Sequence, residues 1–118
     1  MTNGKAIVLV FKSDGMGVAP ASAQDLRERL AATFLRLVQE MDVLPRAICF
    51  YTDGVKLVCD GSPLLDPLKT LEEKGVRLIV CQTCLNFFGL TERVRVGVVG
   101  GMADILTAMW AADTVIAL

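Results

Sequence analysis

The chain has 118 residues, of which 53% are apolar and 21% are charged, and its formal net charge is -1 at pH 7. We therefore expect one domain over residues 1–118 and no binding to nucleic acid or to an anionic membrane surface, because both need an excess of basic residues. The sequence contains no histidine, which excludes Ser-His-Asp and Cys-His nucleophile systems and every zinc site that needs imidazole.

Three features bear on the location and assembly of the protein. Residues 1–5 contain no basic segment that leads into a long apolar stretch, so we expect no signal peptide, and Asp104 and Asp113 interrupt the apolar C-terminal region. Four cysteines in such a chain are expected to be reduced, which favours a cytoplasmic location over a disulfide framework. The mean hydropathy of +0.53 is high for a small domain, and we expect a homo-oligomer.

In the first half of the chain, a continuous apolar run predicts a strand buried on both faces at residues 6–11, followed by a loop to Pro20. A long amphipathic helix is expected over residues 23–41. Its apolar residues recur at spacings of three and four and fall on one face: Leu26, Leu30, Phe34, Leu37, Val38 and Met41. A second strand is expected over residues 47–51, ending in a Thr-Asp-Gly turn.

The second half of the chain repeats this alternation. Ser62 and Pro63 predict the start of a helix that runs to about Lys74 and stops at Gly75. Strands are expected over residues 76–80, 94–99 and 114–118, and one more helix over residues 103–112. Strands that alternate with helices indicate a parallel sheet with helices on both faces.

Ligands of open parallel sheets bind at the carboxyl ends of the strands. Four loops are expected there, and one of them holds the only CxxC motif of the chain, Cys81-Gln82-Thr83-Cys84. A cysteine beside a helix N-terminus faces unpaired backbone N–H groups, which favour the reactive thiolate. A second cysteine three residues later can attack a persulfide or mixed disulfide formed on the first. The motif therefore indicates redox exchange or the transfer of a sulfane sulfur.

Two other interpretations of the cysteines remain open. Cys81 and Cys84 can be ordinary buried thiols, as we interpret Cys49 and Cys59, because free cysteine is among the most buried residue types. A zinc site would need all four cysteines, and their spacing lacks the two close pairs of structural sites, so we predict no metal.

Polar residues of the neighbouring loops are the candidates for ligand binding. Gly15-Met16-Gly17 resembles the start of a dinucleotide fingerprint, but Pro20 stands where the third glycine belongs, so a simple turn is expected. The backbone of this turn can still bind an anion. Asp14 and Asp53 either lie near each other or cap turns. The binding candidates at this edge are Ser13, Asp14, Gly15, Asp53 and Thr83.

The stretch from Gly75 to Leu90 contains a strand, then Cys-Gln-Thr-Cys-Leu, then a Gly-Leu pair. It resembles the DsrE-like (DsrE/DsrF/TusD) superfamily, and most closely the C-terminal domain of YedF-type selenium-metabolism proteins. Similar segments span nearly the whole chain, at residues 11–14, 54–62, 96–98 and 102–105.

The resemblance implies a three-layer α/β/α fold with a five-stranded parallel sheet, and assembly into trimers or hexamers. Sulfur-relay members of the superfamily hold a persulfide on a cysteine eight residues before a glycine and pass it to a partner protein. Cys81 stands eight residues before Gly89 and matches that position, and Cys84 would be a resolving thiol.

Three functions follow as hypotheses. The first is a sulfur-relay protein, and so a possible sulfurtransferase, that needs no cofactor and has a small sulfur-carrier protein as partner. The second is a non-catalytic oligomeric module that binds a small ligand. The third is thiol–disulfide oxidoreduction, which is less favoured because thioredoxin-like proteins carry their CxxC after the first strand and here it follows the third.

Overall fold

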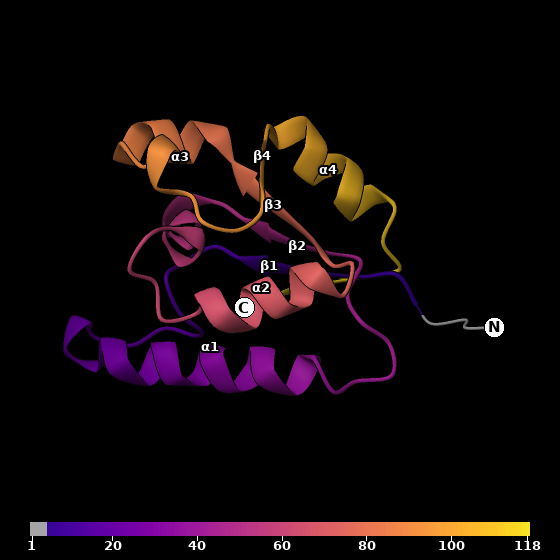
Figure 1. The fold of residues 1–118 in the computed structure, drawn as a ribbon, viewed down its shortest axis with the longest axis horizontal. Coiled ribbons are helices and arrows are strands. Elements are labelled where there is room, and N and C mark those ends of the chain that lie inside the picture. The colour runs from indigo at the N-terminus through magenta and orange to yellow at the C-terminus, as the bar shows by residue number, and fades with distance from the viewer. Residues whose placement is uncertain (1–4) are drawn as a thin grey trace.

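The computed structural model describes residues 5–118 and contains a five-stranded parallel sheet (Figure 1). Its strands are β1 (Ile7–Phe11), β2 (Ala47–Phe50), β3 (Arg77–Cys81), β4 (Val98–Gly100) and β5 (Thr114–Ala117). They lie in the order β4-β3-β2-β1-β5, and all four neighbouring pairs are parallel. The predicted sheet is confirmed. Residues 1–4, on which the expectation of no signal peptide largely depends, lie outside the described part.

Helices cover both faces of the sheet. They are α1 (Gln24–Val38), α2 (Leu65–Glu73), α3 (Gln82–Phe88) and α4 (Met102–Trp110), with short 3-10 segments η1 (Ala21–Ala23), η2 (Thr52–Val58) and η3 (Thr91–Arg93). Figure 1 shows α1 and α2 on one side of the sheet and α3 and α4 on the other, which confirms the three-layer α/β/α architecture. Within residues 5–118, no helix is long and apolar enough to cross a membrane.

The core lies on the three central strands. Nearly every residue of β1, β2 and β3 is buried, as expected for strands of a parallel sheet covered on both faces. Phe11 and Phe50 are partners in the register of β1 and β2, and their rings stack 5.8 Å apart at the carboxyl end of the sheet. The last residues of these strands are thus held together directly beneath the loops where a ligand site was predicted.

Helix α1 is shorter than predicted and turns a different face to the core. Its buried residues are Arg27, Ala31 and Leu35. The apolar residues predicted on one face form a flank that is half-buried or exposed, and they include Leu26, Leu30, Phe34, Leu37, Val38 and Met41. Part of this flank joins residues of β1 and β5 in an apolar groove of about 330 Å³. In this orientation of α1, Arg27 faces the loop after β1 and makes hydrogen bonds to it.

Two other element boundaries differ from the prediction. Helix α2 begins at Leu65 rather than at Pro63, because the Ser62 hydroxyl accepts a hydrogen bond from the Leu64 N–H (3.1 Å) in a turn before the helix. Strand β4 is confined to residues 98–100, because Gly97 has a φ of +89° and Val94 forms an isolated antiparallel bridge with Cys59. The predicted stop of α2 at Gly75, with a φ of +100°, is confirmed.

Candidate functional site

The two cysteines of the CxxC motif lie on two different elements. Cys81 is the last residue of β3, in register with Gly100 of β4, and Cys84 lies in the first turn of α3. The motif is therefore a junction between strand and helix rather than a free turn, as Figure 1 shows for the β3–α3 connection. Helix α3 ends at Gly89, whose φ of +67° suits a glycine C-cap. Thr83 is exposed on α3.

Burial separates the four cysteines into three that are inaccessible and one that is not. Cys81 is only 2% exposed, and Cys49 and Cys59 are also buried, whereas Cys84 is partly exposed. All four are free thiols in the described chain. The interpretation of Cys49 and Cys59 as core residues is confirmed, and access to the CxxC pair from solvent leads first to Cys84.

A backbone group of the turn that follows β2 contacts Cys84. The N–H of Thr52, the residue that begins η2 after β2, donates a hydrogen bond to the Cys84 Sγ at 3.1 Å. Thr52 has a φ of +52°, and it is the only non-glycine residue between 5 and 118 with a positive φ. A β-branched side chain rarely adopts this backbone conformation. Sequence reasoning missed Thr52, because the contact uses a backbone atom that every non-proline residue carries.

The surroundings of Cys84 favour its neutral thiol. Burial raises the pKa of Cys84, the Thr52 N–H acts in the opposite direction, and Cys81 and the Asp53 carboxylate raise the pKa further. The N-terminus of α3, which was expected to favour the thiolate of the cysteine at the strand end, does not lower the pKa of Cys84 below its ordinary value. Helix α3 has only seven residues, and loss of hydration outweighs the hydrogen bond from the backbone.

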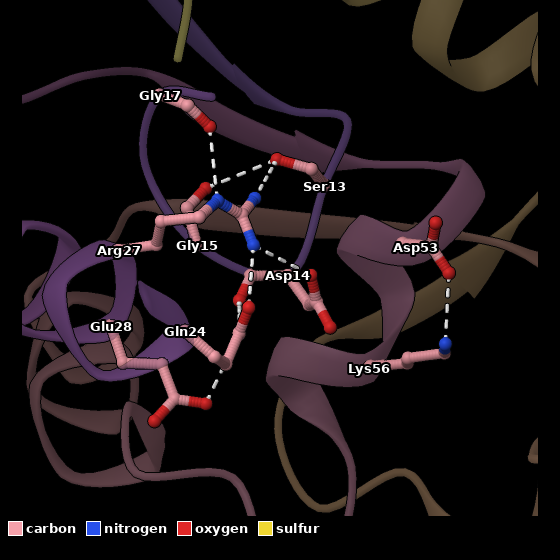
Figure 2. Close-up of polar contacts among 9 residues, drawn as sticks. All are labelled: Ser13, Asp14, Gly15, Gly17, Gln24, Arg27, Glu28, Asp53 and Lys56. Atoms are coloured by element: carbon pink, nitrogen blue, oxygen red, sulfur yellow. Dashed lines mark hydrogen bonds and ion pairs between the residues drawn. The ribbon is translucent and has the colours of Figure 1, made fainter. Parts of the chain in front are cut away.

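An ion pair of η2 and an aromatic pair lie at the C-terminal turn of α3. The Asp53 carboxylate binds the Lys56 ammonium at 2.8 Å (Figure 2), and the ammonium lies 4.5 Å from the centre of the Phe88 ring. Phe88 in turn packs edge-to-face on Phe87, whose side chain is 84% exposed. Asp53, a predicted site residue, belongs to the surroundings of Cys84 because its carboxylate raises the pKa of that thiol.

The other predicted binding residues are held by a buried arginine (Figure 2). The guanidinium of Arg27 donates to the Asp14 carboxylate (3.0 Å), the Ser13 hydroxyl (2.7 Å) and the Gly17 carbonyl (3.0 Å). It also donates to the Gln24 side chain at 2.7 Å. A Cβ at Gly15 would lie 2.7 Å from that of Arg27, so the loop closes tightly around this side chain. The side chains of Ser13 and Asp14 thus make hydrogen bonds that hold this loop to Arg27.

Asp14 and Asp53, which were considered as possible neighbours at the sheet edge, are each paired with a cation of their own. Arg27 was not predicted as a site residue. The signal that could have found it is its spacing of four and eight residues from Ala31 and Leu35, which places it on their face of the helix. Within the described chain, no group of three or more Cys, Asp or Glu side chains is arranged to hold a metal ion.

The fold and the thiols at the carboxyl edge of the sheet define an α/β domain whose candidate chemistry is that of cysteine. The model of the DsrE/DsrF-like family matches residues 5–118, and the chain belongs to this family. No curated protein matches it. A particular closeness to YedF-type proteins stays a prediction.

Solved structures that share the fold include the following two. The ychN protein from E. coli is 21% identical with a TM-score of 0.68, and the alignment covers 98% of this chain and 100% of that one. The protein of unknown function MTH1491 from Methanobacterium thermoautotrophicum is 18% identical with a TM-score of 0.67 and the same coverage. At these identities the likeness concerns the fold.

Proposed function

We propose that this protein is a sulfur-relay protein, which carries sulfane sulfur as a persulfide on its CxxC pair and passes it to a small sulfur-carrier protein. The observation that carries the proposal is the pair of free thiols at the β3–α3 junction, one buried and one reachable, in a member of the DsrE/DsrF-like family. Free thiols also suit the reducing cytoplasm, which we propose as the location.

The transfer needs no cofactor. A thiolate of the pair attacks the outer sulfur of a donor persulfide, R–S–SH. A new S–S bond forms on the protein, the S–S bond of the donor breaks, and its electron pair leaves with R–S⁻. Attack by an acceptor thiolate on the outer sulfur of the protein persulfide repeats the exchange in the opposite direction. Atoms, protons and electrons balance in both steps without an external oxidant.

We also propose that the protein works as a homo-oligomer, a trimer or a hexamer. Apolar side chains lie exposed on helices α1 and α4 and on the two edge strands of the sheet, β5 and β4. On α1 and β5 these are Leu26, Leu30, Leu37, Val115 and Ile116, and on α4 and β4 they are Val98, Val99, Met102, Leu106 and Trp110. Monomers rarely leave such surfaces open to water.

The alternative of a small-ligand-binding module has less support. It would use the loop after β1, but the Ser13 hydroxyl and the Asp14 carboxylate are both engaged by Arg27. A ligand at this loop would have to compete with hydrogen bonds that the chain already makes.

Intact-protein mass spectrometry after brief exposure to a small persulfide tests the proposal. The wild-type protein is expected to gain one sulfur atom that a reductant removes, and the double variant Cys81→Ser/Cys84→Ser is expected to gain none. The variant Cys49→Ser/Cys59→Ser is the matched control, because it keeps two cysteines but changes only the core pair. The proposal would be contradicted if this control lost the sulfur uptake, or if no form of the protein gained sulfur.

A further inference from the structure

We propose that Cys84, rather than Cys81, is the thiol that accepts the sulfur, and that Thr52 is its positioning residue through the backbone N–H. This inference rests on the proposed function and assigns the roles within it. It departs from the role that the family resemblance gives to Cys81.

The first argument is access. Attack on a donor persulfide requires the outer sulfur to reach the thiolate in line with the leaving sulfur. Cys81 is only 2% exposed, so a donor cannot reach its thiol without displacing the residues that cover it. Cys84 stands one helical turn further on, where its side chain meets solvent.

The second argument is the backbone conformation of Thr52. A β-branched residue at a φ of +52° is strained, and such strain persists only where the surrounding structure imposes it. Three features hold this turn in place. The Tyr51 N–H binds the Phe11 carbonyl (3.2 Å), the Gly54 N–H binds the Tyr51 carbonyl (2.9 Å), and Gly54 packs against the Phe11 carbonyl with no room for a side chain.

The direction of the Thr52 N–H shows what this fixed turn achieves. The N–H is aimed at the sulfur of a residue 32 positions away on helix α3. Burial, the Cys81 thiol and the Asp53 carboxylate, which Lys56 partly neutralises, all work against negative charge on Cys84. The Thr52 N–H is the contact that favours the thiolate, so it stabilises the anion where attack requires it.

The sulfur-loading arm of the test uses single variants. Cys81→Ser is expected to keep the gain of one sulfur from a small persulfide, and Cys84→Ser is expected to lose it. The opposite pattern would overturn this inference and leave the proposed function intact. No gain on wild type or on either variant would overturn both.

The second arm measures the role of the N–H in the Cys81→Ser background. The residue Thr52 is replaced with its α-hydroxy acid analogue, which exchanges the N–H for an ester oxygen. The reaction of Cys84 with a small aromatic disulfide is then followed from about pH 7 to about pH 11, a range chosen around the ordinary cysteine pKa. Cys81→Ser/Cys84→Ser supplies the background rate of the two core cysteines.

A lost hydrogen bond to the thiolate is expected to reduce the thiolate fraction about tenfold at neutral pH. Since a thiolate of higher pKa is about threefold more nucleophilic, the net rate should fall about threefold at neutral pH and should rise, by less than about threefold, at the alkaline end, where both thiols are largely ionised. The two pH profiles therefore cross. General loosening of the fold would instead accelerate the reaction at every pH.

Thr52→Val is the matched control, because it keeps both the N–H and the branched side chain and loses only the hydroxyl. Its profile is expected to coincide with that of the parent protein. Superimposed profiles for the ester and the parent would overturn the role of Thr52, and so would a Thr52→Val profile that crosses in the same way as the ester.

Discussion

Gly54 packs directly on the carbonyl oxygen of Phe11, so that a Cβ atom at residue 54 would overlap this oxygen. The turn that follows β2 therefore rests on the end of β1, and the position of the Thr52 N–H depends on this contact. Any side chain at residue 54 must push the turn away from the sheet.

For this reason, Gly54→Ala is expected to lower the free energy of unfolding by about 3 kcal/mol and to slow the sulfur uptake of the folded fraction. Urea unfolding followed by circular dichroism measures the first effect. Gly101→Ser is the control, because the nearest atom to a Cβ at Gly101 is 4.0 Å away and serine suits this N-cap position. Equal stabilities of the two variants would contradict the close packing.

Arg27→Met is expected to destabilise the protein by about 2 to 4 kcal/mol, although methionine preserves most of the apolar stem. The loss comes from the acceptors on Ser13, Asp14 and Gly17 that the guanidinium satisfies from a buried position. Arg27→Lys should recover little of this stability, because a lysine ammonium cannot reach the several acceptors that the planar guanidinium contacts. Arg29→Met, at an exposed position of the same helix, is expected to change stability by less than about 0.5 kcal/mol, and a larger loss there would point to helix propensity instead.

Asp53→Asn is expected to make Cys84 more reactive. The Asp53 carboxylate is one of the groups that raise the pKa of Cys84, so its removal lowers that pKa and increases the thiolate fraction at neutral pH. Because the carboxylate is partly exposed and paired with Lys56, the gain in rate toward a small disulfide should be only about two- to threefold. Asp60→Asn, which removes a carboxylate paired with Arg95 instead, should leave the rate unchanged. A slower reaction of Asp53→Asn would contradict this prediction and show that the Asp53–Lys56 ion pair increases the reactivity of Cys84.

Stability is expected to fall in alkaline solution because of Cys49. Burial raises the pKa of Cys49 from 9.0 to about 11, so the folded protein keeps this proton at a pH where the unfolded chain releases it. Unfolding then releases a proton, and the free energy of unfolding decreases as the pH rises from about 9 toward 11, by up to about 2 to 3 kcal/mol. Cys49→Ala should reduce this slope, leaving the smaller contributions of Cys59 and Cys84, even though it lowers stability at neutral pH. An unchanged slope would assign the alkaline loss to other groups.

The strands and the CxxC motif were predictable because each is encoded by a short run of neighbouring residues. Three continuous apolar runs mark β1, β2 and β3, which parallel sheets bury on both faces. The rotation of α1 was not predictable in the same way. Leucine spacing places the apolar face at Leu26 and Leu30, whereas the fold buries the neighbouring face, where Arg27 reaches the loop after β1.

Part of the candidate site is invisible to sequence reasoning for a physical reason. A Thr-Asp-Gly turn was predicted here, but the Thr52 contact with Cys84 uses a backbone N–H, and threonine is among the residues least suited to a positive φ, so the sequence indicates neither the contact nor this backbone conformation. A helix N-terminus was expected beside the CxxC motif, but no bounds were predicted for helix α3, and whether burial or the helix end governs the acidity of Cys84 depends on packing between α3 and η2. Residue types alone do not fix that packing.

The position of β5 beside β1 also affects how the protein folds during its synthesis. The Ala6 N–H binds the Asp113 carboxylate, 107 positions later, and residues 7–10 pair with residues 114–117. While the chain leaves the ribosome, β1 can acquire β2 as a neighbour but keeps its other edge open until β5 has been translated. An open apolar strand edge readily pairs with another nascent chain. The interval before β5 emerges is therefore when this domain most needs protection by a chaperone.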